Sequence, residues 1–366
     1  MTGVIIAGGA GTRLRPLTNS RPKPMMPLAG KPLLGYQVEL LRKHAVTDVV
    51  FCVGGDVDVV RQHFGDGDGL GVHISYSVES KPLGTAGAVR FAEPYLQSDT
   101  LVVMNGDSLT DYDLSAMVRF HSDMKADATI GLTEVPRPTP CGVVTTDAEK
   151  RVTAFQEPDL EAKRMLAADR PAGGGTVTVN SGVYVIGRAR LVIIPFGVES
   201  SIEKQFFPSI ISDGRRVYGF PVSGYWADIG NAGNYLQAHH DLLAGKVDAE
   251  ILGEKTDAGY WTTGECEIAP SAEVLPGAHL GAGTKIGPGA RITGFAAIGP
   301  GCVIGDGSLV DGCVLLENVV VGSGCVLRSS VVDRDSTIGD GVQLADNSVV
   351  AAGSVVLAQD AIEDKT

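Results

Sequence analysis

The chain has 366 residues, with 43 acidic and 30 basic side chains and a formal net charge of −13. This length favours two or three domains, and a hydrophobic content of 44% is enough for a substantial core. Nucleic acids and anionic membrane surfaces attract basic protein surfaces, so we expect this acidic chain to bind neither.

Targeting and redox signals are weak. No stretch approaches the ~20 apolar residues of a membrane span, and the apolar run at residues 4–7 is too short for a signal peptide. The six cysteines form no CxxC pair and have no histidine at zinc-site spacing. We therefore expect a cytoplasmic protein with free thiols.

Apolar runs alternate with helical patterns over the first part of the chain. Strands are predicted at "GVIIA", "DVVFCVG", "VHISYSV" and "TLVVMNGD", and helices at residues 33–45, 57–64 and 85–96, the last in spite of Pro94. This alternation predicts parallel βαβ units in a doubly wound, Rossmann-like mixed sheet. Ligands of such sheets bind outside the carboxyl ends of the strands, where "NGD" falls.

The pattern changes near residue 260. A helix predicted within "NAGNYLQAHHDLLAG" ends at Gly245, and a polar stretch continues to Glu265. These features divide the chain into a catalytic domain at residues 1–245, a linker at 246–265 and a second domain at 266–358.

Aliphatic residues recur at six-residue spacing through the second domain. The first run is Ile268, Val274, Leu280, Ile286, Ile292, Ile298, Ile304 and Val310, and the second is Val314, Val320, Val326, Val332, Ile338, Leu344, Val350 and Val356. Glycine often follows, as at 281, 287, 299, 305 and 339. This period predicts a parallel β-helix of roughly five coils, and hexapeptide repeats of this type resemble the left-handed β-helix. Its exposed flat sides predict a homodimer or homotetramer assembled through residues 266–366.

A basic, glycine-rich segment follows the first strand. "AGGAGTRLRPLTNSRPKP" holds three arginines, one lysine and three prolines but no acidic residue. The Walker and dinucleotide patterns both fail, since no GK[ST] follows and Leu14 occupies the third glycine position. Glycines allow backbone amides to converge on an anion, and Arg13 and Lys23 favour a polyphosphate. We expect both side chains on a solvated loop.

Motifs across residues 1–240 resemble one enzyme family. The opening segment fits GGxGTRLxPxTxxxPKP at every fixed position, and "PLGTAG", "NGD", "NSGVY" and "YWADIG" follow in order. This combination resembles the sugar nucleotidyltransferases, and the "PLGTAG" form with a C-terminal β-helix resembles the mannose-1-phosphate guanylyltransferase group. The resemblance implies that an NTP, with GTP favoured, reacts with a mannose-1-phosphate-like acceptor to give NDP-sugar and pyrophosphate.

The resemblance also implies roles for individual residues. The implied catalytic residues are Arg13, Lys23, Asp107 and Asp228, and the two aspartates are the implied Mg²⁺ ligands. The implied nucleotide-binding residues are Ala7, Gly8, Gly9, Gly11, Thr12, Arg13, Glu79, Gly84 and Thr85. The implied sugar-binding residues are Gly142, Glu157, Asn180 and Gly182.

One departure from the family leaves the acceptor open. The family usually carries FxEKP, whereas this chain reads "FQEPDLE", with Pro158 at the position of the phosphate-binding lysine. An insertion at residues 159–177 follows at once. The acceptor could instead be a heptose or a cyclitol 1-phosphate, such as that of valienol, in secondary metabolism.

Two further alternatives have less support in the sequence. A catalytically inactive regulatory paralogue would not need the intact Arg13, Lys23, Asp107 and Asp228. A second, acetyltransferase activity on the β-helix would need a histidine base, and His279 is the only histidine after residue 245.

Overall fold

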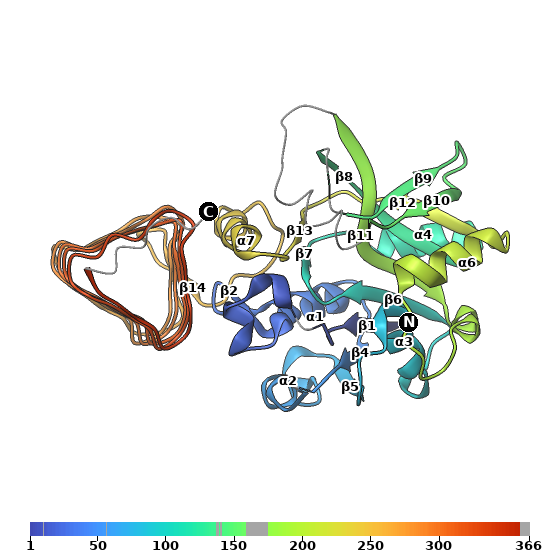
Figure 1. Cartoon of the computed structure of the whole chain (residues 1–366), viewed down its shortest axis with the longest axis horizontal. Coiled ribbons are helices and arrows are strands. Elements are labelled where there is room, and N and C mark those ends of the chain that lie inside the picture. Colours follow the sequence, from blue (N-terminus) through green and yellow to red (C-terminus); the bar gives the residue numbers. More distant parts are fainter. Residues whose placement is uncertain (10, 56, 137–138, 140, 159–174, 359–366) are drawn as a thin grey trace. The chain divides into compact units, whose positions relative to one another are not determined.

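The computed structural model describes residues 1–366 apart from residues 10, 56, 137–138, 140, 159–174 and 359–366 (Figure 1). Most of the insertion after Pro158 therefore lies outside the described residues. The chain divides into two compact units. We call residues 1–9 with 37–226 the sheet unit, and residues 10–36 with 227–366 the β-helix unit.

The sheet unit is built on a mixed sheet with the strand order β10-β9-β11-β6-β1-β4-β5. Strand β8 pairs with β11, and β12 pairs with β8. The strands of this sheet are β1 (Thr2–Ile6), β4 (Asp48–Val53), β5 (His73–Val78), β6 (Thr100–Asn105), β8 (Ala128–Pro136), β9 (Val143–Thr146), β10 (Val152–Gln156), β11 (Thr176–Gly187) and β12 (Val217–Pro221). The strands β6, β1, β4 and β5 pair in parallel, whereas β11 runs antiparallel to β6. The four predicted strands and the mixed Rossmann-like sheet are thereby confirmed. Two short strands, β7 (Ser108–Thr110) and β13 (Trp226–Asp228), lie outside this sheet.

The helices are α1 (Leu33–Lys43), α2 (Val57–Phe64), α3 (Gly84–Phe91), α4 (Leu114–Asp123), α6 (Phe207–Ser212) and α7 (Ala232–Leu243). The prediction that one helix continues through Pro94 is wrong. The helix α3 ends at Phe91, and a separate 3₁₀ turn, Glu93–Tyr95, carries the proline. A proline ring inside the helix would clash with the carbonyl one turn earlier and would donate no hydrogen bond.

The β-helix is a stack of short parallel strands that form three faces, and its ribbon outlines a triangle in Figure 1. The first face comprises β15 (Trp261–Thr262), β18 (His279–Leu280), β21 (Ala297–Ile298), β24 (Val314–Leu315), β27 (Val331–Val332) and β29 (Val349–Val350), with β14 (Glu254–Lys255) antiparallel at its edge. The second comprises β16 (Glu267–Ile268), β19 (Lys285–Ile286), β22 (Val303–Ile304), β25 (Val320–Val321), β28 (Thr337–Ile338) and β30 (Val355–Val356). The third comprises β17 (Glu273–Val274), β20 (Arg291–Thr293), β23 (Leu309–Asp311) and β26 (Val326–Arg328).

The hexapeptide register is confirmed at both ends of the β-helix and is wrong in the middle. Leu315, Val321 and Leu327 belong to its core, in place of the predicted Val314, Val320 and Val326. The pairing of Ile298 with Leu315 and of Ile304 with Val321 fixes this register. Neighbouring side chains of a strand point to opposite faces, so an error of one residue turns the wrong side chain inward.

Two shorter corners account for the change of register. Most corners place a residue with positive φ three positions after the core aliphatic residue, as at Gly301 (φ 70°) after Ile298. At Gly312 and Ser329 the positive φ comes one residue earlier. The glycines directly after the aliphatic residues allow neighbouring coils to pack closely. A Cβ on Gly299, for example, would lie 2.7 Å from the backbone of the next coil.

The opening segment also belongs to the β-helix unit, as does α7. It holds 3₁₀ turns at Thr12–Leu14, Leu17–Asn19 and Lys23–Met25, and the short strands β2 (Pro27–Leu28) and β3 (Lys31–Pro32). Across the described ranges of both units, no helix has the length and apolar character needed to cross a membrane.

Candidate functional site

The opening segment folds back on itself at Gly11. This glycine has φ 58°, and a Cβ there would lie 3.0 Å from the Cβ of Lys23. The hydroxyl of Thr18 donates to the carbonyl oxygen of Gly11 over 2.9 Å. A glycine is therefore required both by the backbone conformation and by the close approach of Lys23.

Two cations of this segment lie beside Asp228. The distance from Arg13 Nη2 to Asp228 Oδ2 is 3.8 Å, and that from Lys23 Nζ to Asp228 Oδ1 is 3.9 Å. A Cβ on Gly230 would lie 2.8 Å from Asp228 Oδ2 and 3.2 Å from Arg13 Nη1. The final glycine of "YWADIG" thus leaves room for this cluster.

The expectation of a solvated loop is confirmed for Arg13 and wrong for Lys23. The Arg13 side chain is 62% exposed, whereas that of Lys23 is 9% exposed. Lys23 begins a 3₁₀ turn whose next residues, Pro24 and Met25, are also buried. Burial of an ammonium group carries a large desolvation cost, which the carboxylate of Asp228 offsets.

In the sheet unit, the "NGD" turn lies against the start of the glycine-rich loop. The amide of Gly106 donates to the carbonyl oxygen of Ile6 over 2.8 Å. A Cβ on Gly106 would lie 3.2 Å from the Cα of Ala7. Asp107, the next residue, is half-buried between β6 and β7. The structure thereby brings Ala7 and Asp107 together at the carboxyl ends of two parallel strands.

Three of the predicted nucleotide-binding residues, Glu79, Gly84 and Thr85, lie at or near the start of α3. The Glu79 carboxylate accepts from the amide of Leu83 over 2.9 Å, and burial raises the pKa of Glu79. Gly84 has φ 67°, and a Cβ there would lie 2.6 Å from the carbonyl oxygen of Ser200. The hydroxyl of Thr85, the next residue, donates to Glu203 over 2.9 Å. These contacts fix the turn that precedes α3.

The predicted sugar-binding residues form a second group in the sheet unit. The amide of Asn180 donates to the carbonyl oxygen of Gly142 over 2.9 Å, and a Cβ on Gly142 would clash with the Glu157 carboxylate. The Asn180 side-chain oxygen accepts from the amide of Gly182 over 3.0 Å. Gly142, Glu157, Asn180 and Gly182 therefore lie close together in one cluster.

Sequence reasoning missed Glu203 and Tyr184, which link these two groups. Glu203 accepts from Thr85 and, over 3.2 Å, from the Tyr184 hydroxyl, which itself accepts from the Asn180 side chain over 2.8 Å. Burial and the nearby Glu203 carboxylate raise the pKa of Tyr184, so its hydroxyl keeps its proton and donates. Glu203 lies in a short π-helix, Ile202–Phe206, a conformation frequent at functional sites.

The predicted metal ligands fall in different units, Asp107 in the sheet unit and Asp228 in the β-helix unit. In the described part of the chain, no group of three or more His, Cys, Asp or Glu side chains is placed to hold a metal ion.

Comparisons with known proteins found matches for both parts of the chain. Residues 2–245 match the nucleotidyl transferase family, and residues 258–362 match the EIF2B subunit epsilon LbH (left-handed β-helix) domain. The chain belongs to the nucleotidyl transferase family. The family resemblance seen in the motifs and the left-handed β-helix are both confirmed.

Two relatives and one solved structure illustrate the similarity. A mannose-1-phosphate guanylyltransferase of Mycobacterium tuberculosis is 37% identical over 250 residues, which cover 68% of this chain and 66% of that protein. A UTP–glucose-1-phosphate uridylyltransferase of Synechocystis is 31% identical over 276 residues, 72% of this chain and 69% of that protein. HddC from Yersinia pseudotuberculosis, solved in complex with GMP-PN, has a TM-score of 0.55 and 26% identity over 66% of this chain and 99% of that chain.

Proposed function

We propose that this chain is a sugar-1-phosphate nucleotidyltransferase that joins an NTP, with GTP favoured, to a mannose-1-phosphate-like acceptor and releases pyrophosphate. Relatives named as guanylyl- and uridylyltransferases support the reaction class. The observation that carries the proposal is the approach of Arg13 and Lys23 to one carboxylate, Asp228, at the end of the glycine-rich loop. An anionic ligand can engage both cations there.

The proposed reaction requires little acid–base catalysis from the protein. The acceptor phosphate is already an anionic nucleophile, so the main task is to bring two anions together while pyrophosphate leaves. We assign Arg13 and the loop amides at residues 8–12 to the triphosphate and the leaving pyrophosphate. Lys23 is assigned to the reacting phosphates, where a fixed cation stabilises the charge of the transition state.

A divalent cation, Mg²⁺, is the proposed cofactor, with Asp107 and Asp228 as its protein ligands. Mg²⁺ prefers oxygen ligands and commonly takes one or two carboxylates, with phosphate oxygens and water completing its shell. Asp228 fits this role because its carboxylate is 29% exposed and adjoins the cations assigned to phosphate. When bound, the metal would neutralise phosphate charge and orient the α-phosphate.

The acceptor site is proposed to contain Gly142, Glu157, Asn180 and Gly182, with Glu157 binding sugar hydroxyls. Pro158 directly follows Glu157 and supplies no cation for the acceptor phosphate. This substitution favours a second candidate, in which the same reaction uses a heptose or cyclitol 1-phosphate.

Homo-oligomerisation through the β-helix is a further proposal. Val303, Val320 and Val355 are 36%, 40% and 63% exposed and lie along one column of the second face, with Thr337 between the last two. Their exposed side chains suit contact with a second copy of the chain. We also propose the functional division into residues 1–245, 246–265 and 266–358, and the cytoplasm as the location.

The experiment that tests the reaction is a matrix of four NTPs against hexose, heptose and cyclitol 1-phosphates, with released pyrophosphate as the readout. We expect GTP with mannose 1-phosphate to give the fastest turnover. A faster heptose or cyclitol pair would establish the second candidate. Absence of pyrophosphate with every pair, in the presence of Mg²⁺, would reject the enzyme and leave an inactive nucleotide-sugar-binding protein.

A further inference from the structure

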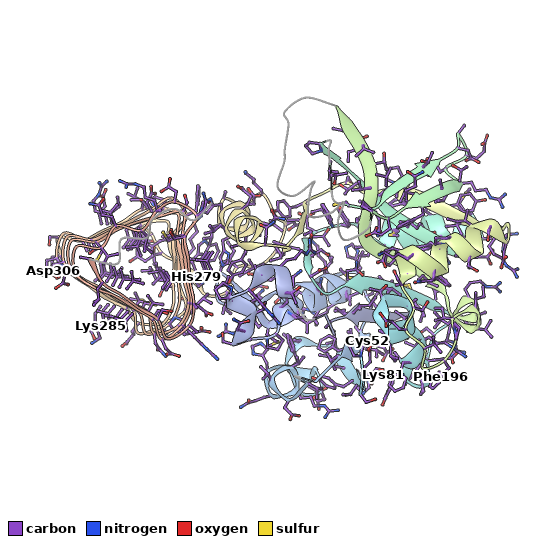
Figure 2. The ribbon with its side chains drawn as sticks, in the orientation of Figure 1. Cys52, Lys81, Phe196, His279, Lys285 and Asp306 are labelled. Atoms are coloured by element: carbon purple, nitrogen blue, oxygen red, sulfur yellow. The ribbon has the colours of Figure 1, made fainter. Side chains whose placement is uncertain are left out.

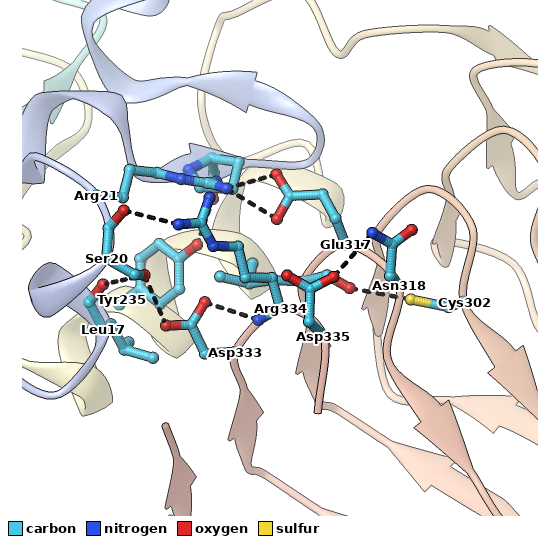
Figure 3. Close-up of polar contacts among 12 residues, drawn as sticks. Leu17, Ser20, Arg21, Tyr235, Cys302, Glu317, Asn318, Asp333, Arg334 and Asp335 are labelled. Carbon is cyan, nitrogen blue, oxygen red and sulfur yellow. Dashed lines mark hydrogen bonds and ion pairs between the residues drawn. The ribbon is translucent and has the colours of Figure 1, made fainter. Parts of the chain in front are cut away.

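The β-helix holds the segment that carries Lys23. Arg21 Nη2 donates to both carboxylate oxygens of Glu317, over 2.7 and 2.9 Å. One residue earlier, the Ser20 hydroxyl donates to Asp333 Oδ2 over 3.2 Å, and the Ser20 carbonyl oxygen accepts from Arg334 Nη2 over 3.0 Å (Figure 3). All these residues belong to the β-helix unit.

The two coils that make these contacts differ from their neighbours. Glu317 and Arg334 occupy equivalent corner positions of successive coils, because Leu315 pairs with Val332. The same position holds Gly264, Ala282, Pro300 and Ala352 in the other described coils of that corner. The β-helix repeat does not itself require charge at this position. The charged pair is therefore specific to the coils that meet the opening segment.

Arg21 is coupled to Lys23 through a stiff backbone. Pro22 lies between them and Pro24 follows, and each proline ring fixes its own φ and restricts the residue before it. The Arg21 side chain is 14% exposed, so its charged contact with Glu317 is only weakly screened by solvent. Displacement of Arg21 is thus transmitted to the ammonium of Lys23.

The far end of the segment is held in the same unit. Tyr235, from α7, donates its hydroxyl to the carbonyl oxygen of Pro27. Lys31 donates to the carbonyl oxygen of Glu250 over 2.7 Å. Lys23 therefore lies between two anchored stretches of chain.

We propose that Glu317 and Arg334 are positioning residues, through which the β-helix places Lys23 for the transfer reaction. This inference rests on the proposed function, since it assumes that Lys23 engages the reacting phosphates. A purely structural contact between two parts of the fold would stabilise the chain without influencing turnover.

The test uses Glu317→Ala and Arg334→Ala in the full-length protein, with Glu267→Ala as the control. Glu267 forms a 2.8 Å ion pair with Lys285 on another face of the β-helix, and both partners are more than half exposed (Lys285 is labelled in Figure 2). For each of the first two variants we expect kcat to fall about tenfold or more with little change in KM, because small misplacement of a catalytic group is costly. Glu267→Ala should turn over as the wild type does.

A second readout does not depend on activity. Lys23 is buried whereas Lys285 is 55% exposed, so acetylation by an amine-reactive ester, quantified by mass spectrometry, should be slow at Lys23 and fast at Lys285. In Glu317→Ala and Arg334→Ala, we expect acetylation of Lys23 to accelerate severalfold while that of Lys285 stays constant.

The outcomes separate the two proposals. Unchanged acetylation of Lys23 in both variants overturns the positioning role, and so does a lowered melting temperature with wild-type kcat. A third outcome is that acetylation of Lys23 is faster in the variants but the wild type releases no pyrophosphate with any substrate pair. That outcome supports the positioning of Lys23 and rejects the proposed function.

Discussion

The two units organise their candidate residues by different kinds of interaction. In the sheet unit, Thr85, Glu203, Tyr184 and Asn180 are joined by hydrogen bonds of 2.8–3.2 Å. In the β-helix unit, Arg13 and Lys23 approach Asp228 at 3.8 and 3.9 Å, which is beyond hydrogen-bond length. The sheet unit thus contains a network of hydrogen bonds, whereas the contacts of Arg13 and Lys23 with Asp228 in the β-helix unit are longer ion pairs.

The largest effect is expected in the core of the β-helix unit. Leu315→Ala should lower the free energy of unfolding by about 2–5 kcal/mol, because it leaves a cavity between coils. Val320→Ala should change it by less than about 0.5 kcal/mol, because this side chain is 40% exposed. Trp261 lies in the β-helix unit and Trp226 in the sheet unit. When both alanine variants are made in a Trp226→Phe background, tryptophan fluorescence therefore reports the unfolding of the β-helix unit. Equal effects of the two alanine variants would contradict the register.

The next effect concerns the proposed metal ligands, one from each unit. Asp107→Asn and Asp228→Asn should each reduce turnover at least ~100-fold, which corresponds to about 2.7 kcal/mol of lost transition-state stabilisation. Circular dichroism should show an unchanged fold. Wild-type turnover in either variant would remove that residue from the proposed metal site.

Acid should weaken the β-helix unit through His239. Burial lowers the pKa of this histidine to about 3, whereas an unfolded histidine has a pKa of about 6.5. Between these values the unfolded chain binds a proton that the folded chain does not, so stability is complete above about pH 6.5 and falls as the pH decreases. We expect a loss of about 2 kcal/mol at pH 5 from this group.

Denaturant unfolding at pH 7.5 and pH 5 measures this loss. His239→Asn should reduce the pH dependence, and His73→Gln, which alters an exposed histidine, should leave it unchanged. An unaltered pH dependence in His239→Asn would show that His239 is not the group responsible.

Local sequence patterns were enough to predict four strands of the sheet unit in their chain order, but they did not fix side-chain direction within the β-helix. The predicted strands of the sheet unit are short apolar runs bounded by glycine or polar residues, and the structure contains all four. At 314–315 and 320–321, two aliphatic residues stand side by side, so hydrophobicity alone could not tell which one points inward. The shortened corner at Gly312 determines that Leu315 and Val321 point into the core.

Contacts between residues far apart in the sequence could not be predicted from local patterns either. A charged residue on a basic segment is ordinarily solvated, and the burial of Lys23 depends on Asp228, some two hundred residues away. Glu203 was missed because its partners Thr85 and Tyr184 lie 118 and 19 residues from it in sequence. No local sequence pattern marks Glu203 as a hydrogen-bond partner of these residues.

The smallest effect should come from the sheet-unit network. Tyr184→Phe removes the hydroxyl that donates to Glu203 and accepts from Asn180, and one such hydrogen bond contributes about 1 kcal/mol. Because the network is preformed, its loss should weaken ground-state binding of the acceptor. We expect KM for the sugar phosphate to rise about fivefold with kcat nearly unchanged. The control is Tyr218→Phe, which alters a half-buried ring in β12 of the same unit. A fall in kcat as large as that of Asp228→Asn would show that the network acts in the transition state, and the contrast between the two units would then be wrong.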